Sequence, residues 1–241
     1  MLRRALAIVW CVVLCTGGGL RAVGQLTENE KKASVGDAPA DPGPLAAHMS
    51  GDLHQAEIKT AMRKVADWQT ARIADTPSQD WTFATLYVGM LSASDTLGMP
   101  LYRNTVRHVA EHFDWRLGPR RTHADDQAIG QSYLWLYRLK PDAKDIAAIH
   151  AQFDEVMVRP DDLAKPVWWW CDALFMAPPV WAGLAAVTHD QRYLDYMDHE
   201  WQVTNSLLWD RMSGCFTGTT AISISARRMG AKCSGLGATG G

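Results

Sequence analysis

One carboxylate of this chain stands directly behind a run of tryptophans. Residues 168–170 are all Trp, and Asp172 follows them, ahead of an apolar segment that ends at Pro178 and Pro179. A carboxyl group among aromatic side chains is poorly hydrated, which disfavours its charged form and raises its pKa. A carboxylic acid that keeps its proton near neutral pH can act as a general acid, and exposed indoles are flat surfaces for sugar rings. The alternative is that Asp172 only caps a helix.

Asp172 belongs to a series of acids that recurs about every 46 residues. The earlier members are Asp80 and the pair Asp125 and Asp126, and each opens a segment with helical spacing of apolar residues. An Asp at a helix start is common because it accepts bonds from free amides and complements the helix dipole. That explanation does not account for the aromatic or His residue that flanks each acid. These flanking residues are Trp81, His123 and Trp170.

The elements that must position these acids are predicted to be helical hairpins, and strand signals are absent. If the first helix of each hairpin begins at the same end, the acids and indoles gather at one mouth of an α/α toroid. This composition is typical of a sugar-binding cleft. The predicted helices are 54–73, then the pairs 80–98 with 101–117, 125–139 with 142–158, and 172–187 with 191–209.

The beginning of the chain predicts export. Arg3 and Arg4 precede an apolar segment, and small residues follow up to Gly24, which is the pattern of a signal peptide over 1–24. We expect no lipid anchor, and no membrane span after cleavage. Residues 25–52 are rich in Gly, Pro and charge without an apolar period, so we expect a disordered leader.

Composition and cysteine spacing exclude other classes. The formal net charge is −2 and no basic stripe is present, so nucleic acid is not an expected partner. Cys171, Cys215 and Cys233, which remain after signal cleavage, lack metal-type spacing. Cys171 is interpreted as an apolar neighbour of Asp172 rather than a nucleophile. A metal site at His123, Asp125 and Asp126 is the weaker alternative, because no distant third ligand is evident.

Three segments carry a family resemblance. HADDQAIGQSYL at 123–134, WWWCDALFMAPPVW at 168–181 and DWT at 80–82 resemble glycoside hydrolase family 105, the unsaturated rhamnogalacturonyl hydrolases, which are related to the family 88 unsaturated glucuronyl hydrolases. The resemblance extends from about residue 54 to residue 214. It implies an all-α (α/α)6 barrel, no cofactor and no metal. The implied substrates are pectin-derived oligosaccharides that end in a 4,5-unsaturated uronic acid.

The resemblance also implies a chemistry and its residues. A carboxyl group protonates C4 of the vinyl ether, water attacks C5, and the resulting hemiketal opens and expels the remaining sugar. Asp172 matches the family's acid/base and Asp125 its second essential carboxylate, with Asp126 as the alternative. Trp81, His123, Asp126 and Trp170 are expected to line the substrate cleft.

The chain departs from the family after Gly214. Residues 53–214 would supply about half of the barrel's hairpins, and 215–241 lack a core pattern. We expect this tail to be out of frame after a single-base deletion near Cys215. Codons exist for which the other frame spells FYRDDSYFDKREANGREMFWSRGNGW, including the family's Trp-Ser-Arg-Gly-Asn-Gly-Trp motif. The fragment would then be inactive, and the downstream DNA should encode the remaining hairpins. The alternative is a disordered tail.

Two other functions stay open at this point. The first is another toroid enzyme acting on sugars, a polysaccharide lyase or an epimerase. Such an enzyme needs a His, Tyr or Arg set that abstracts a proton, which helices headed by Asp do not obviously provide. The second is a helical-repeat protein that binds carbohydrate without catalysis.

Overall fold

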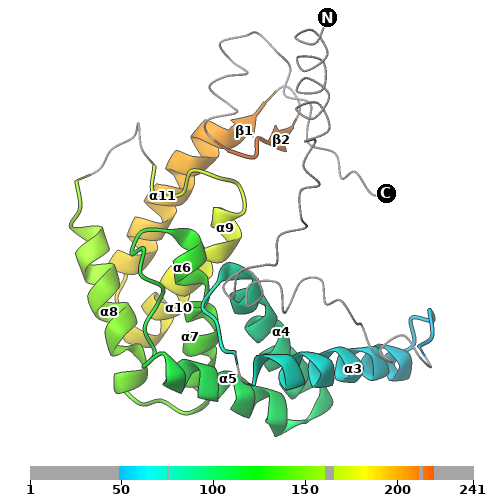
Figure 1. The fold of residues 1–241 in the computed structure, drawn as a ribbon. Coiled ribbons are helices and arrows are strands. Elements are labelled where there is room, and N and C mark those ends of the chain that lie inside the picture. The colour runs from blue at the N-terminus through cyan, green and yellow to red at the C-terminus, as the bar shows by residue number, and fades with distance from the viewer. Residues whose placement is uncertain (1–48, 75, 161–165, 212–213, 220–241) are drawn as a thin grey trace, which may run out of the picture. The chain divides into compact units, whose positions relative to one another are not determined.

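A computed structural model describes residues 49–74, 76–160, 166–211 and 214–219 (Figure 1). The predicted signal peptide, most of the predicted leader and the tail after residue 219 lie outside the described residues. Within the described part, no helix is long and apolar enough to cross a membrane. The labels follow Figure 1 and start at α3.

The described residues form an all-α fold with one short hairpin of strands, which confirms the predicted fold class. The helices are α3 (Gln55–Ile73), α4 (Trp81–Leu97), α5 (Pro100–His112), α6 (Ala124–Ala128), α7 (Gly130–Leu139), α8 (Lys144–Met157), α9 (Ala173–Met176), α10 (Pro178–Thr188) and α11 (Arg192–Leu208). Strands β1 (Trp209–Asp210) and β2 (Cys215–Phe216) pair in antiparallel register.

The long helices form three hairpins arranged in two layers (Figure 1). Helices α4, α7 and α10 pack side by side as an inner layer, and each packs against the helix that follows it, α5, α8 or α11. The first hairpin turns at Gly98, whose φ of 65° is left-handed, and α5 restarts at Pro100. Glycine suits this position because it has no Cβ to clash, and Pro suits the first helical turn because it needs no amide partner there. The predicted stop and restart at 98–100 is confirmed.

Two predicted helices are wrong as continuous elements. The expected helix 125–139 is divided into α6 and α7 at Ile129, and the expected helix 172–187 is divided into α9 and α10 at Ala177. In the second case Pro178 and Pro179 have no N–H, so the carbonyls one turn earlier lose their helical donors. The breaks leave α6 and α9 as short helices that carry the predicted acids.

Aromatic packing holds the inner layer to the outer layer. Trp181 of α10 is fully buried and stacks on Phe153 of α8 at 3.8 Å and on Tyr196 of α11 at 4.4 Å between ring centroids. Its indole N–H donates to Gln127 Oε1 at 3.0 Å, so the polar end of the ring is satisfied. Burying such a side chain contributes about 2–3 kcal/mol before conformational entropy is subtracted. Gly130 permits close packing here, because a Cβ at that position would lie 2.5 Å from Val180.

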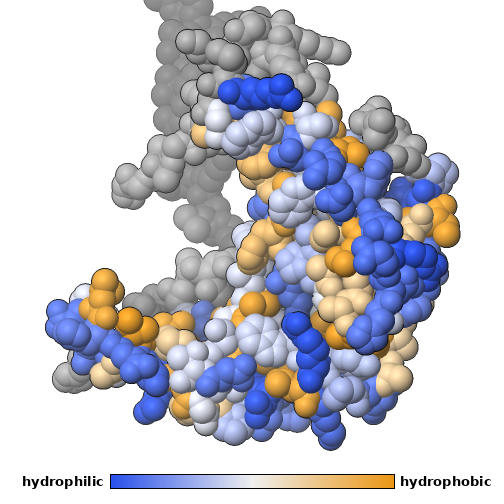
Figure 2. Space-filling view, turned by 180° about the vertical axis from the view of Figure 1, so that it is seen from behind, coloured by the Kyte–Doolittle hydropathy of each residue, from blue (hydrophilic) through white to orange (hydrophobic). Residues whose placement is uncertain are grey.

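An apolar groove of about 390 Å³ runs between α3 and α4. Met62 and Val65 of α3 face Leu86 and Met90 of α4 across it, and Val65 is half exposed. Figure 2 shows hydrophobic surface along the projecting helix α3. Within the described residues no element covers this groove.

Candidate active site

The predicted acids lie at the starts of inner-layer segments. Asp80 immediately precedes α4, Asp125 lies in the first turn of α6, and Asp172 immediately precedes α9. Neither Asp80 nor Asp172 makes a side-chain capping hydrogen bond to its helix. Asp172 thus occupies the N-cap position of α9, but its side chain does not cap the helix. The expectation that the neighbouring tryptophans leave this carboxyl poorly hydrated is wrong, because Asp172 is exposed. Among the described residues its exposed carboxylate has no hydrogen-bond or ion-pair partner, which leaves it free to meet a ligand.

Asp125 faces the same space as Asp172. Helices α6 and α9 pack against each other, and the two carboxylates are near enough to repel. The pKa of Asp125 is raised, first by burial and then by the charges of Asp172 and Asp126, while His123 and Arg120 oppose the rise. One group of this pair is thus partly desolvated and the other is exposed. Two carboxyl groups in different environments can divide the roles of acid and charge stabiliser.

His123 lies between one of the acids and the tryptophan run. Its Nδ1 lies 3.6 Å from Asp125 Oδ2 and, although buried, has no hydrogen-bond partner in the described structure. Its ring lies 4.7 Å from that of Trp170, at an angle of 40°. A buried polar atom without a partner is costly, which marks His123 as a group that a ligand or water would satisfy.

The predicted aromatic surfaces have different degrees of exposure. Trp170 is buried between His123 and Trp169, and its ring meets that of Trp169 edge-on at 4.6 Å. Trp169 and Trp81 are the exposed indoles, at 44% and 46%. Trp170 therefore packs between His123 and Trp169, whereas Trp81 and Trp169 are accessible to solvent and could meet a ligand. Trp169 was not among the predicted site residues, although its place in the tryptophan run could have indicated it.

Asp126 has a different environment from the cleft position predicted for it. Its carboxylate is buried and accepts hydrogen bonds from the Arg120 backbone N–H at 2.7 Å and from Arg120 Nε at 3.0 Å, with a further contact from Nη2. These bonds use both carboxylate oxygens. The two neighbouring acids of α6 thus have different partners, because Asp126 is bonded to Arg120 of the preceding loop whereas Asp125 lies near Asp172.

Gln131 of α7 bonds to α9, the helix that follows Asp172, and the sequence analysis missed it. Its side-chain amide donates to the carbonyl of Phe175 at 3.1 Å and to that of Met176 at 2.9 Å. In a continuous helix the amide of residue 179 would serve the Phe175 carbonyl, but that residue is proline. The consecutive prolines were the available signal that a side chain must supply these donors.

The segment after Gly214 reaches the tryptophan run. The Cys171 N–H donates to the carbonyl of Gly218 at 3.0 Å, and Thr219 forms a β-bridge with Trp170. Residues up to 219 therefore support the backbone that precedes Asp172. The domain boundary predicted at Gly214 stays a prediction.

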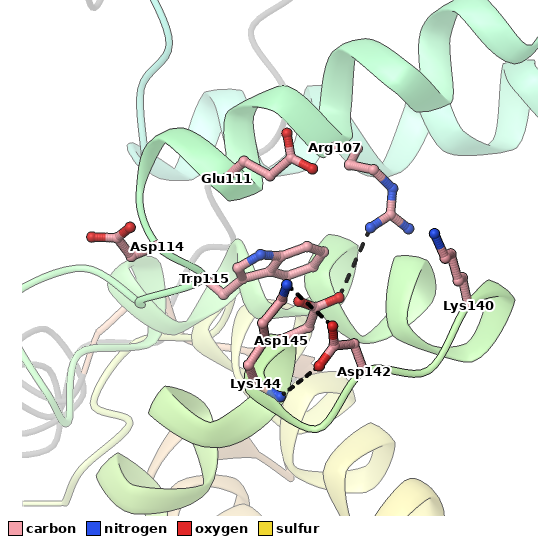
Figure 3. A pocket seen from close by; sticks show the side chains of 8 residues that line it. All are labelled: Arg107, Glu111, Asp114, Trp115, Lys140, Asp142, Lys144 and Asp145. Carbon is pink, nitrogen blue, oxygen red and sulfur yellow. Dashed lines mark hydrogen bonds and ion pairs between the residues drawn. The ribbon is translucent and has the colours of Figure 1, made fainter.

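A second cluster of acids lies at the other end of α7, around a cavity of about 570 Å³ (Figure 3). Here each acid has a cation near it: Asp142 pairs with Lys144 Nζ at 3.1 Å, and Asp145 lies 3.9 Å from Arg107 Nη1. Among the described residues, no three His, Cys, Asp or Glu side chains converge as metal ligands, either here or in the cleft.

Comparison with known proteins agrees with this arrangement. The sequence model of Glycosyl Hydrolase Family 88 matches residues 54–221. An unsaturated 3S-rhamnoglycuronyl hydrolase of Formosa agariphila is 33% identical over 177 residues, which cover 68% of this chain and 47% of the relative. A protein of the same name from Alteromonas sp. (strain LOR) is 30% identical over 156 residues, 56% of this chain and 38% of the relative. The chain thus spans about half the length, or less, of these relatives.

Two solved structures share the fold. One, described as a polysaccharide lyase, superimposes with a TM-score of 0.62 at 23% identity and covers 69% of this chain and 51% of its own. The other, a family 88 glycosyl hydrolase from Bacteroides vulgatus, gives a TM-score of 0.55 at 23% identity and covers 60% and 45%. The sequence match over most of the chain, with its acids at one end of a helical toroid segment, shows that this chain belongs to glycosyl hydrolase family 88.

Proposed function

We propose that this site removes a 4,5-unsaturated uronic acid from an oligosaccharide by hydrating its double bond. The observation that carries the proposal is the exposed, unpartnered carboxylate of Asp172 beside the raised-pKa carboxyl of Asp125. The names of the two curated relatives support a substrate in which the unsaturated uronate is joined to rhamnose. A pectin-derived rhamnogalacturonan fragment, as the family 105 resemblance implies, is one such substrate.

The chemistry requires one proton donor and one water. Asp172 gives its proton to C4 as the C4=C5 π electrons form the new C–H bond, which leaves oxocarbenium character at C5. The resulting Asp172 carboxylate then takes a proton from water as its oxygen bonds to C5. The hemiketal opens to a ketone and the aglycone leaves with a proton. Burial raises the pKa of Asp125 and by itself would favour Asp125 as the proton donor, so the assignment of the proton to Asp172 rests on its match to the family's acid/base. In the ionised form, which the charges of His123 and Arg120 favour, Asp125 stabilises the cationic transition state, and Trp81 and Trp169 hold the sugar by stacking.

The open groove between α3 and α4 bears on the activity of this chain alone. An uncovered apolar groove favours self-association, because apolar surface is removed from water in a contact. We therefore expect the 241-residue chain to associate and to turn over substrate poorly. The same site is expected to work in a completed barrel, made by joining residues 54–219 to the C-terminal part of the Formosa agariphila relative. Export through residues 1–24 also remains a proposal.

The test follows the ultraviolet absorbance of an unsaturated uronyl–rhamnose disaccharide incubated with the completed barrel. Hydration removes the conjugated double bond, so the absorbance falls while a carbonyl product appears. A lyase acting on intact polysaccharide would raise the absorbance instead, and a binding module would change neither signal. Unchanged absorbance with a folded protein would refute the proposed function.

A further inference from the structure

The loop that leads into the site, residues 117–123, is fastened to α6 by its backbone; we call it the strap. The Gly118 N–H donates to the Asp126 carbonyl at 2.9 Å. A Cβ at Gly118 would lie 2.7 Å from the Asp126 side chain, so only glycine permits this approach. The Gln127 amide donates to the Arg121 carbonyl at 2.8 Å and its oxygen accepts from Trp181, which joins the strap to the buried core.

Arg120 is the one strap residue whose side chain closes on Asp126. Its backbone N–H, Nε and Nη2 all donate to that carboxylate, which is only 7% exposed. Hydrogen bonds between a guanidinium and a carboxylate are charge-assisted, and two donors on one carboxylate fix direction as well as distance. The Arg120 side chain is therefore held in place although more than half of it is exposed.

The same guanidinium also acts on Asp125. Successive residues of a helix project about 100° apart, so Asp126 holds Arg120 while Asp125 points in a different direction from α6. The groups around Asp125 are Arg120 of the strap, His123 at the start of α6, Asp126 of α6 and Asp172 at the start of α9. Burial and both aspartates raise the Asp125 pKa, and Arg120 and His123 lower it. Arg120 is the member of this set whose cationic form does not depend on pH.

We propose that Arg120 is a positioning residue of the site, clamped by Asp126 so that its positive charge stands beside Asp125 and offsets the charge of Asp172. The proposal rests on the proposed role of Asp125 in hydration. In this proposal the two adjacent acids act together: Asp126 binds the guanidinium of Arg120, and the positive charge of that guanidinium favours the ionised form of Asp125. A purely structural Arg120–Asp126 pair would stabilise the strap without affecting the ionisation of Asp125.

The experiment measures the Asp125 pKa by NMR in the full chain, with ¹³C-labelled aspartate carboxyls and Asp125→Asn to assign the signal. In Arg120→Gln the pKa should rise by about half a pH unit or more, because the opposing charge is lost while burial and Asp172 remain. Arg120→Lys keeps the positive charge, so the Asp125 pKa in this variant should lie close to that of the wild type. Arg116→Gln is the matched control, since Arg116 is exposed and pairs with Asp114 instead, and should leave the pKa unchanged.

The outcomes separate the inference from the proposed function. An Asp125 pKa that is equal in wild type and Arg120→Gln overturns the inference, whatever the turnover. If Arg120→Gln does not fold, Arg120→Lys decides: an upward shift in a folded Lys variant would contradict a charge-based role. A shift in Arg120→Gln, reversed by Lys, supports the inference even if the completed barrel proves inactive, which would refute only the proposed function.

Discussion

The two ends of α7 carry similar residues in opposite arrangements. In the cavity of Figure 3, the exposed Asp142 has Lys144 within hydrogen-bond distance, and this contact lowers its pKa. In the cleft, Asp172 has no partner in the described structure, and burial raises the pKa of Asp125. Burial also raises the pKa of Asp145 in the cavity, but Arg107 lies 3.9 Å from that carboxylate. The difference between the two groups is therefore Asp172, which has no neighbouring cation in the described structure. Acidic composition alone thus does not distinguish a surface cluster from a reactive site.

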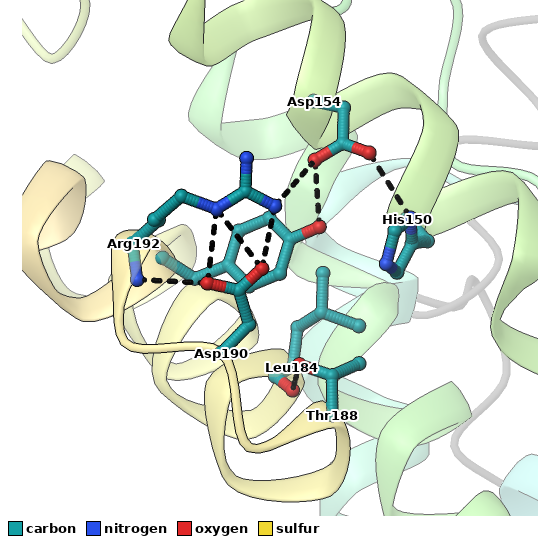
Figure 4. A network of polar contacts seen from close by, with 7 residues as sticks. His150, Asp154, Leu184, Thr188, Asp190 and Arg192 are labelled. Atoms are coloured by element: carbon teal, nitrogen blue, oxygen red, sulfur yellow. Dashed lines mark hydrogen bonds and ion pairs between the residues drawn. The ribbon is translucent and has the colours of Figure 1, made fainter.

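A third polar cluster, shown in Figure 4, also resembles the first group rather than the cleft. Asp190 and Arg192 form a multiply bonded pair, and Asp154 accepts from Tyr193 at 2.8 Å and lies near His150. These contacts tie α8 to the turn before α11. Every acid in this cluster has a partner, so its purpose is structural.

The largest effect is expected when the unpartnered acid of the cleft is changed. Asp172→Asn in the completed barrel should lower kcat about a thousandfold or more, because the amide cannot deliver the proton. The melting temperature should stay close to that of the parent, since Asp172 makes no side-chain bond to lose. The matched control is Asp142→Asn from the cavity cluster, which should retain turnover. A near-normal kcat in Asp172→Asn would show that Asp172 is no more important for turnover than Asp142 at the other end of α7.

The neighbours Asp125 and Asp126 should fail in different ways. Asp125→Asn should lower kcat about a hundredfold, with Asp126→Asn milder on turnover but destabilising by about 2 kcal/mol through the lost Arg120 bonds. Steady-state kinetics of both variants compare their kcat values, and thermal melts compare their stabilities. If Asp126→Asn were the more damaging to kcat, the catalytic assignment within the pair would be reversed.

The difference in stability between Asp125→Asn and the wild type should depend on pH with a predictable sign. A raised folded-state pKa means that the ionised Asp125 destabilises the folded chain, so stability falls as pH rises from about 3.8 through the raised value. Removing the charge should therefore raise the melting temperature by about 1–3 °C at neutral pH, with the gain disappearing below pH 4. A variant that is less stable than wild type at neutral pH would contradict the raised pKa.

A smaller effect is expected at Gln131, which joins α7 to α9. Gln131→Ala should lower kcat/KM about tenfold, because the carbonyls of Phe175 and Met176 lose their donors and α9 shifts relative to α6. Gln191→Ala is a suitable control, since that exposed side chain bonds to Asp195 at the start of α11 and contacts neither the strap nor α9. Equal kinetics in the two variants would show that α9 is held by packing alone.

The smallest effect is expected at the exposed indole of Trp169. Trp169→Ala should raise KM severalfold with little change in kcat, because stacking holds substrate and transition state alike. Trp201 of α11 is similarly exposed but far along the chain from the acids, and Trp201→Ala should leave KM unchanged. A kcat effect at Trp169 larger than its KM effect would move this residue from binding to catalysis.

The sequence predicted what depends on local pattern and missed what depends on contacts across the fold. Helical spacing and the Gly98–Pro100 turn were sufficient for the hairpins, because they are decided within a few residues. The breaks at Ile129 and Ala177 were missed, although Pro178 and Pro179 remove the helical donors on which a continuous helix depends. The pairing of Asp126 with Arg120 and the bond of Gln131 to α9 require knowing which segments meet in space, and periodicity does not contain that information.

The most direct test of the account is the fate of solvent hydrogen at C4 of the uronate. The completed barrel is incubated with the unsaturated disaccharide in D₂O, and the product is examined by NMR at early conversion, before the ketone exchanges its neighbouring hydrogens. If Asp172 protonates C4, one deuterium appears at C4, the double bond is lost on hydration, and the aglycone is released when the hemiketal opens. Release of the aglycone with the C4=C5 double bond intact and no deuterium at C4 would contradict hydration and the role given to Asp172.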